Sequence, residues 1–257
     1  MTGLNMTDPD LRAEAVRTLI RRSGSEDVPL AALAGADLCM LGGPRHAVFP
    51  EATAKAWLQF DERERGEYIR SATDRLVRKG LLIEKPGQAE YAMSPELGVI
   101  LASRCRPAYA VVVESDGLSV PVLSMFALGD EREPVRAVAV ESLAHIAGDP
   151  AKRGVRPLTC GYAYVLVSPQ RAGQLLADMV IRPVDKLHRW SKEPGRVVTR
   201  FTPVDARGRI GQRLKVRGNG TAARVAGWDS GNPDAARDYA RPELEAAMAG
   251  FLEGAMP

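Results

Sequence analysis

The chain has 257 residues, of which 45% are apolar and 5% aromatic, and its net charge is +3. This length supports one large domain or two small ones, each with a hydrophobic core. No apolar run approaches the roughly 20 residues that span a bilayer, and the first residues lack an apolar signal core. Cys39, Cys105 and Cys160 lie far apart, which indicates a reducing compartment without disulfides. We therefore expect a cytoplasmic protein that neither spans a membrane nor follows the general secretion route.

The net charge is unevenly spread along the chain. Residues 182–224 contain twelve Lys or Arg and three acidic residues, so this segment carries +9 and the remainder carries −6. This asymmetry is more informative about contact surfaces than the total charge.

The N-terminal part is predicted to be mostly helical. Asp10–Arg22 has a capping acid and an apolar face, whereas Val28–Ala36 is predicted to be a second short helix or a turn. Glu51–Phe60 forms a further helix. Asp61–Lys79 is the clearest helix, because acids crowd its start, bases crowd its end, and Gly80 is a natural C-terminal cap.

A helix, a hairpin and a second helix follow one another within Tyr68–Leu101. The helix that ends at Lys79–Gly80 is followed by a short strand, a tight turn at Pro86–Gly87, a second strand and a helix that begins at Ser94–Pro95. This order is typical of a winged-helix unit, and it is also found as a purely structural joint in interaction proteins.

The C-terminal part is predicted to be rich in strands. Turn residues at Asp116–Gly117 and Gly218–Gly220 favour hairpins, and helices are predicted from Ser168–Pro169 to about Val180 and over Pro242–Leu252. The predicted strands are Tyr109–Glu114, Val120–Leu128, Arg136–Val140, Tyr162–Val167, Arg196–Thr202, Ile210–Arg217 and Ala222–Trp228.

These elements predict an α+β fold. Residues 1–104 form a helical, winged-helix-like region, and residues 105–257 form an antiparallel sheet with packed helices. Near residue 104 the predicted elements change from mostly helices to mostly strands, and no flexible linker is obvious there.

No arrangement of residues points to a reaction. His46, His145 and His188 are isolated, and no His or Cys pair has the spacing of a metal site. Gly218–Gly220 lies between two predicted strands, so it cannot place a phosphate at a helix N-terminus. We therefore expect no cofactor, no metal and no catalytic residue, and hence a binding protein.

The basic segment supplies one candidate contact surface. Strand alternation puts Arg213, Lys215 and Arg217 on one face, with Leu214 and Val216 opposite. Such a face can contact phosphates, an acidic protein surface or only water. Aromatic residues are scarce in the segment, which weakens the case for a single-stranded nucleic acid platform.

Two binding functions remain open. In the first, the chain is a non-enzymatic adaptor that binds a protein partner through its sheet and loops. That function requires an apolar surface patch near the hairpins, with Leu123, Met125 and Phe126 as candidates. In the second, the chain is a winged-helix transcriptional regulator that binds double-stranded DNA. Its C-terminal half then senses a ligand or mediates dimerisation, which gives a homodimer.

DNA binding would use the helix before the hairpin together with the adjacent turn. In a winged helix this helix enters the major groove and the turn contacts phosphates. The basic residues in these positions are Arg70, Arg75, Arg78, Lys79 and Lys85. Acidic residues interleave with these bases (Glu67 and Asp74) or flank the turn (Glu84 and Glu90). Their negative charge opposes phosphate binding.

A helix with a Gly-Leu-Leu turn at Leu76–Leu82 precedes the Pro-led helix at Ser94–Leu101 and the strand Tyr109–Glu114. Arg-rich strands and a closing helix fill Arg196–Leu252. This order, over about two-thirds of the chain, resembles the EspG family of cytosolic proteins associated with ESX (type VII) secretion in actinobacteria. The Ala, Arg, Gly and Val richness is typical of high-GC codon usage and agrees with an actinobacterial source.

The resemblance has a functional implication. It implies a chaperone-like adaptor that holds a helical secretion substrate against a sheet, with no catalytic residues. The family usually opens with a strand, whereas helices are predicted first in this chain.

Overall fold

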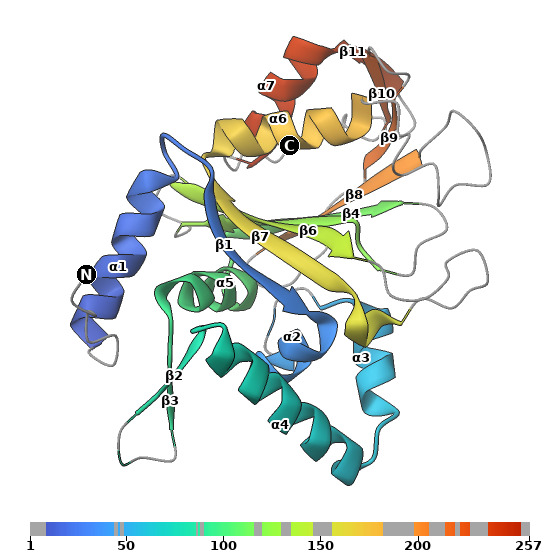
Figure 1. Ribbon diagram of the computed structural model, residues 1–257. Helices are drawn as coiled ribbons and strands as arrows, with labels where there is room; N and C mark the ends of the chain where they lie inside the picture. The colour runs from blue at the N-terminus through green and yellow to red at the C-terminus, as the bar shows by residue number, and fades with distance from the viewer. Residues whose placement is uncertain are drawn as a thin grey trace.

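An antiparallel sheet with helices on both faces organises the molecule (Figure 1). Helices come first along the chain and most of the sheet follows, so the predicted α+β fold is confirmed. The computed structural model describes residues 9–43, 46, 49–85, 87, 90–115, 120–129, 135–145, 156–181, 198–205, 214–218, 222–226 and 236–252.

Nine of the described strands form one sheet. They are β1 (Val28–Ala34), β4 (Tyr109–Ser115), β5 (Leu123–Leu128), β6 (Ala137–His145), β7 (Gly161–Val167), β8 (Val198–Asp205), β9 (Leu214–Gly218), β10 (Ala222–Ala226) and β11 (Ala236–Ala240). Their order is β1-β7-β6-β5-β4-β8-β9-β10-β11, and each neighbouring pair is antiparallel. The strand β1, from the first part of the chain, thus lies at one edge of a sheet built mainly by the second part.

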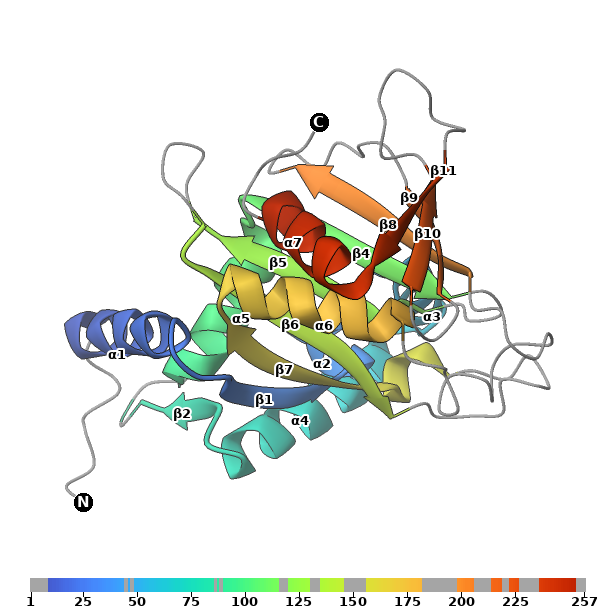
Figure 2. The same cartoon turned by 90° about the horizontal axis from the view of Figure 1, so that it is seen from above.

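Helices cover the sheet from two sides. They are α1 (Pro9–Arg22), α2 (Gly35–Leu41), α3 (Glu51–Leu58), α4 (Glu62–Arg78), α5 (Pro95–Cys105), α6 (Pro169–Ile181) and α7 (Arg241–Leu252), with a short 3-10 turn η3 (Pro157–Thr159). The pair α6 and α7 lies on one face, and the N-terminal helices lie on the other (Figures 1 and 2).

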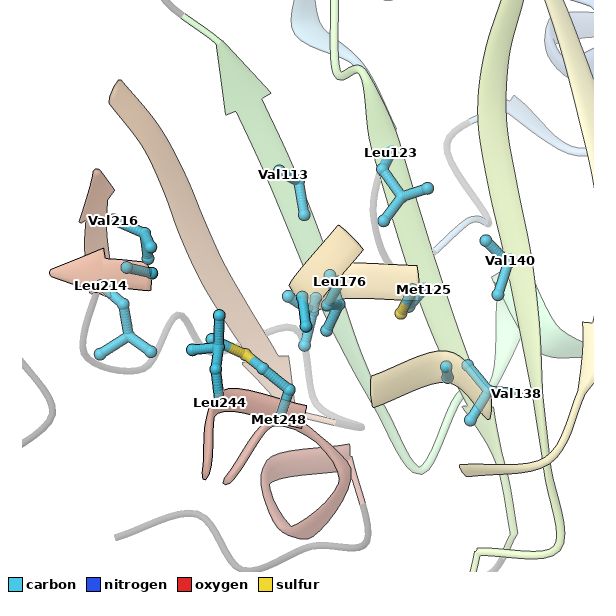
Figure 3. Packing of buried hydrophobic residues seen from close by; sticks show 14 of the residues in the cluster. Val113, Leu123, Met125, Val138, Val140, Leu176, Leu214, Val216, Leu244 and Met248 are labelled. Carbon is cyan, nitrogen blue, oxygen red and sulfur yellow. The ribbon is translucent and has the colours of Figure 1, made fainter. Parts of the chain in front are cut away.

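The core beneath α6 and α7 joins strands from both halves of the sheet. Leu176 of α6 and Leu244 and Met248 of α7 pack against β4–β6, β9 and β10 (Figure 3). The two helices approach closely at Gly173, where an added Cβ would lie 2.7 Å from the backbone nitrogen of Ala249. The glycine therefore permits the crossing of α6 and α7.

On the opposite face, α5 and α1 pack against the central strands. Val99 of α5 and Leu19 of α1 share a core with Phe126, Leu166 and Val204. Because both faces of β4, β5 and β6 are covered, their apolar residues run almost without interruption. In β9 and β10, by contrast, buried and exposed residues alternate, as in a sheet with one solvated face.

The segment Val28–Ala34 is an edge strand, so the prediction of a short helix or turn over Val28–Ala36 is wrong. The strand pairs with β7, and its register shifts between Pro29 and Ala32. Proline lacks an N–H group and is tolerated at a sheet edge, where no partner strand needs that donor. The ammonium group of Lys79 also covers this edge, because it donates to the carbonyl of Ala32 at 3.0 Å.

The predicted helix–hairpin–helix order is confirmed by α4, the hairpin β2 (Leu82–Glu84) and β3 (Tyr91–Met93), and α5. Asp61 and Glu64 form a capping box at the start of α4. Gly80 ends it with a φ of 68°. The Ser94 hydroxyl accepts a hydrogen bond from Leu97 N at 3.2 Å and begins α5.

The C-terminal strands differ from the prediction in their bounds. Ala236–Ala240 forms β11. The sequence does not predict this strand, because the segment lacks β-branched residues, and its backbone is held extended by pairing with β10. β6 continues to His145, beyond the predicted end at Val140, and β8 continues to Asp205, beyond the predicted end at Thr202. The predicted turn Asp116–Gly117 lies outside the described residues.

Candidate interaction surfaces

The apolar residues predicted to bind a partner are buried. Leu123 is 5% exposed, and Met125 and Phe126 are fully buried. They lie on β5, a central strand covered on both faces, so the side chains of this strand pack into a core on either side. The expectation that these three residues form a surface patch is therefore wrong.

Large apolar side chains are exposed elsewhere, mainly on the N-terminal half. Tyr91 and Met93 of β3 are 45% and 38% exposed, whereas Ala92 between them is 1% exposed. Glu84 lies opposite Tyr91 in the hairpin register and is also exposed. We call Glu84, Tyr91 and Met93 the wing face. Among the residues that the structure describes, the other large apolar residues that are exposed are Leu11, Leu58 and Ile69.

A signal for the wing face was present in the sequence. The order Tyr-Ala-Met in a short strand alternates large, small and large side chains, which indicates that only one side packs against the body. The hairpin projects from the helices in Figure 1. On the side of β3 opposite to Ala92, Tyr91 and Met93 are exposed, whereas Leu82, which lies opposite Met93, is 8% exposed.

Several bases proposed for DNA binding are engaged within the chain. Arg75 forms an ion pair with Asp37, a fully buried carboxylate that also accepts a hydrogen bond from the backbone N–H of Ala34, the last residue of β1. Lys79 donates to the edge of β1, and Lys85 pairs with Glu90 at 2.8 Å. The carboxylate of Glu90 has its pKa lowered by this hydrogen bond and by the charge of the ammonium group.

Arg70 and Arg78 remain exposed, but acidic residues accompany them. Exposed residues three or four positions apart on α4 lie on one stripe of the helix. The charges along that stripe alternate in sign in the order Arg63, Glu67, Arg70, Asp74, Arg78. A surface of this kind has little net attraction for a phosphate backbone.

The predicted alternation of the basic strand is confirmed where the structure describes it. Leu214 and Val216 are buried and Lys215 is exposed. The backbone of Arg217 pairs with that of Arg224, which is exposed. Arg213 lies outside the described residues.

The basic sheet face therefore contains Lys215 and Arg224 on β9 and β10. Asp238 of β11 lies opposite Arg224 in the register and reduces the positive charge at that edge. The guanidinium carbon of Arg237 lies 4.9 Å above the ring of Tyr239, a residue that is 8% exposed. The described strands β9–β11 thus offer no exposed aromatic side chain on which a base could stack.

A buried polar network connects α5 to the sheet. Arg104 of α5 and Glu141 of β6 are each 1% exposed and form an ion pair, and the hydroxyl of Tyr164 donates to the same carboxylate. The guanidinium carbon of Arg104 also lies 5.0 Å above the ring of Phe126. These contacts satisfy the charges that burial would otherwise leave uncompensated.

His46 completes the network, because its Nδ1 accepts a hydrogen bond from Arg104 Nε at 3.3 Å. Burial, together with the charge of Arg104, lowers the pKa of His46 to about 3, so the ring is neutral at physiological pH. His145 is exposed, and His188 lies outside the described residues. The sequence alone gave no signal for this network, since its members are far apart along the chain.

Within the part of the chain that the structure describes, no group of three or more His, Cys, Asp or Glu side chains could hold a metal ion. Burial raises the pKa of the Cys39 thiol to about 12, so it is not an activated nucleophile. Among these residues, no helix is both long and apolar enough to cross a membrane. No protein-family model matches the chain, and a search of curated proteins finds no significant match.

Proposed function

We propose that the chain is a non-enzymatic adaptor that binds a protein partner in the cytoplasm. The main support for this proposal is the wing face. It exposes two large apolar side chains and a carboxylate on a hairpin that projects from the body. Exposed apolar residues grouped on one element are typical of protein contact surfaces.

Chaperoning of helical type VII secretion substrates is the specific form of this proposal. The resemblance to the EspG family supports it. That family usually opens with a strand, whereas α1 precedes β1 in this chain. A protein that only holds a substrate needs a contact surface and no catalytic group.

DNA binding by a winged helix is the second candidate. The order α4–β2–β3–α5 and the exposure of Arg70 and Arg78 favour it. It is the weaker candidate because Arg75, Lys79 and Lys85 are engaged within the chain.

Complex formation with a helical substrate tests the proposal. The full chain is co-expressed with a panel of helical-hairpin type VII substrates, and each pair is passed over a size-exclusion column. We expect one or more substrates to co-elute with the chain as a stable complex and to be soluble only in its presence. Insolubility of every substrate, or separate elution of every pair, would contradict the chaperone function.

A further inference from the structure

The wing face combines apolar area with negative charge. Tyr91 and Met93 project on the side of β3 opposite to the buried Ala92, and Glu84 lies across from Tyr91. Side chains directly opposite in an antiparallel pair are neighbours on one face. The three side chains thus form a small apolar surface with a carboxylate at its border.

No base of the described hairpin offsets the Glu84 carboxylate. Lys85 is engaged by Glu90, whose side chain is 68% exposed, at 2.8 Å. Among the described residues of the hairpin, Glu84 and Glu90 are the acids and Lys85 is the base, so the wing carries a net charge of −1. A complementary surface would therefore be apolar with a Lys or Arg at its edge.

We propose that the wing face is the docking site for a segment of a protein partner that presents apolar side chains together with a Lys or Arg. This inference rests on the proposed protein-binding function and names the chemistry of the partner. The apolar side chains contact Tyr91 and Met93, and the base pairs with Glu84. The basic sheet face of Lys215 and Arg224 would select the opposite, acidic, partner.

Two other occupants fit the wing face less well. A nucleic acid would place phosphates next to the Glu84 carboxylate, which repels them. A second copy of this chain in a two-fold contact would bring the same patch of both copies together, so two Glu84 carboxylates would enter one apolar contact. Both arrangements place like charges where a base is needed.

Selection from a displayed random peptide library, followed by fluorescence anisotropy with the enriched peptides, tests this site on the full chain. We expect enriched peptides to combine apolar residues with Lys or Arg. The double variant Tyr91→Ser and Met93→Ser is expected to weaken their binding about tenfold or more, because truncating central apolar contacts removes most of the affinity. Circular dichroism checks that each variant is folded.

The matched control is Leu58→Ser, which removes a side chain that is 69% exposed on α3, away from the hairpin. It is expected to leave the affinity unchanged. Glu84→Lys is expected to weaken binding, and a peptide whose Lys or Arg is replaced by Glu is expected to bind this variant better than wild type. Such a charge exchange is specific to a direct contact.

Three outcomes would overturn the inference. Enriched peptides whose affinity is unaffected by the wing variants place the site elsewhere, while protein binding itself stands. Acidic peptides that lose affinity in Lys215→Glu and Arg224→Glu assign binding to the basic sheet face. If no peptide is enriched and the chain also fails to bind any helical substrate, both the site and the proposed function are contradicted.

Discussion

The hairpin unit formed by α4, β2, β3 and α5 and the C-terminal strands β9–β11 expose opposite chemistries. The hairpin exposes apolar side chains and a carboxylate, and several of its neighbouring bases are engaged within the chain. The strands β9–β11 bury their apolar residues beneath α6 and α7 and expose Lys215 and Arg224. Strand alternation correctly predicts that Lys215 is exposed, whereas the apolar residues Leu123, Met125 and Phe126, predicted to be exposed, are buried.

This difference shows that a contact surface depends on which faces the fold leaves open. Leu123, Met125 and Phe126 are as apolar as Tyr91 and Met93, but β5 is covered from both sides. On the hairpin, Leu82 packs into a core, but Glu84, Tyr91 and Met93 on the same face remain exposed. Substitutions in the contacts that fix each region should therefore test the comparison.

The largest expected effect comes from Glu141→Ala, which breaks the tie between α5 and the sheet. Arg104 is then left as an uncompensated buried charge, so we expect a loss of about 3–5 kcal/mol in the free energy of unfolding. Urea denaturation followed by circular dichroism measures it. The triple variant Arg104→Met, Glu141→Leu and Tyr164→Phe removes all of these polar groups and should recover most of the loss. A loss of less than about 1 kcal/mol in Glu141→Ala would show that the network is not buried as described.

Glycine-to-alanine substitutions compare α5 of the hairpin unit with α6, which covers β9 and β10. Gly173→Ala places a Cβ 2.7 Å from Ala249 N and 2.8 Å from Glu245 O, so α7 must move away from α6. We expect a destabilisation of about 1–3 kcal/mol. Gly98 of α5 has no atom within 4 Å of an added Cβ, so Gly98→Ala should stabilise by about 0.5–1 kcal/mol. Thermal melts of the two variants measure both, and shifts of the same sign would refute the close helix contact.

The stability of the chain should depend on pH through His46. The unfolded chain binds a proton at this residue near pH 6.5, whereas the folded chain binds it only near pH 3. Stability is therefore fully present above pH 6.5 and falls as the pH is lowered toward 3. Between pH 7 and pH 5, the wild type should lose about 2 kcal/mol more than His46→Gln. Parallel curves for the two proteins in urea titrations would argue against a neutral, buried His46.

The smallest expected effect is a difference among the three thiols. Cys105 is partly exposed, whereas Cys39 and Cys160 are buried, and burial raises the pKa of Cys39. A thiol reagent such as DTNB should label Cys105 first in the native chain, and Cys105→Ser should remove the fast phase. Fast labelling of Cys39 would indicate that α2 opens readily.

Most of the successful predictions rest on interactions between residues that are close together in the sequence. The capping residues Asp61 and Ser94 and the terminal Gly80 define the ends of α4 and α5, because each acts on backbone groups a few positions away. Alternation likewise placed Leu214 and Val216 inside and Lys215 outside.

Features that depend on distant partners could not be found in this way. Val28–Ala34 is a strand because β7 pairs with it, and β7 lies far from β1 in the sequence. The network of Arg104, Glu141 and His46 joins three separate segments. Burial of β5 on both faces required knowledge of where the helices pack.

The central claim, that the chain binds protein and does not read DNA, is tested most directly by fluorescence anisotropy with random duplex DNA over a range of salt concentrations. We predict no saturable binding even at low salt, because the exposed stripe of α4 alternates in charge and Lys85 is paired. Saturable binding with a log–log salt slope of about −0.9 for each of several phosphates, reduced in Arg70→Glu and Arg78→Glu, would contradict it.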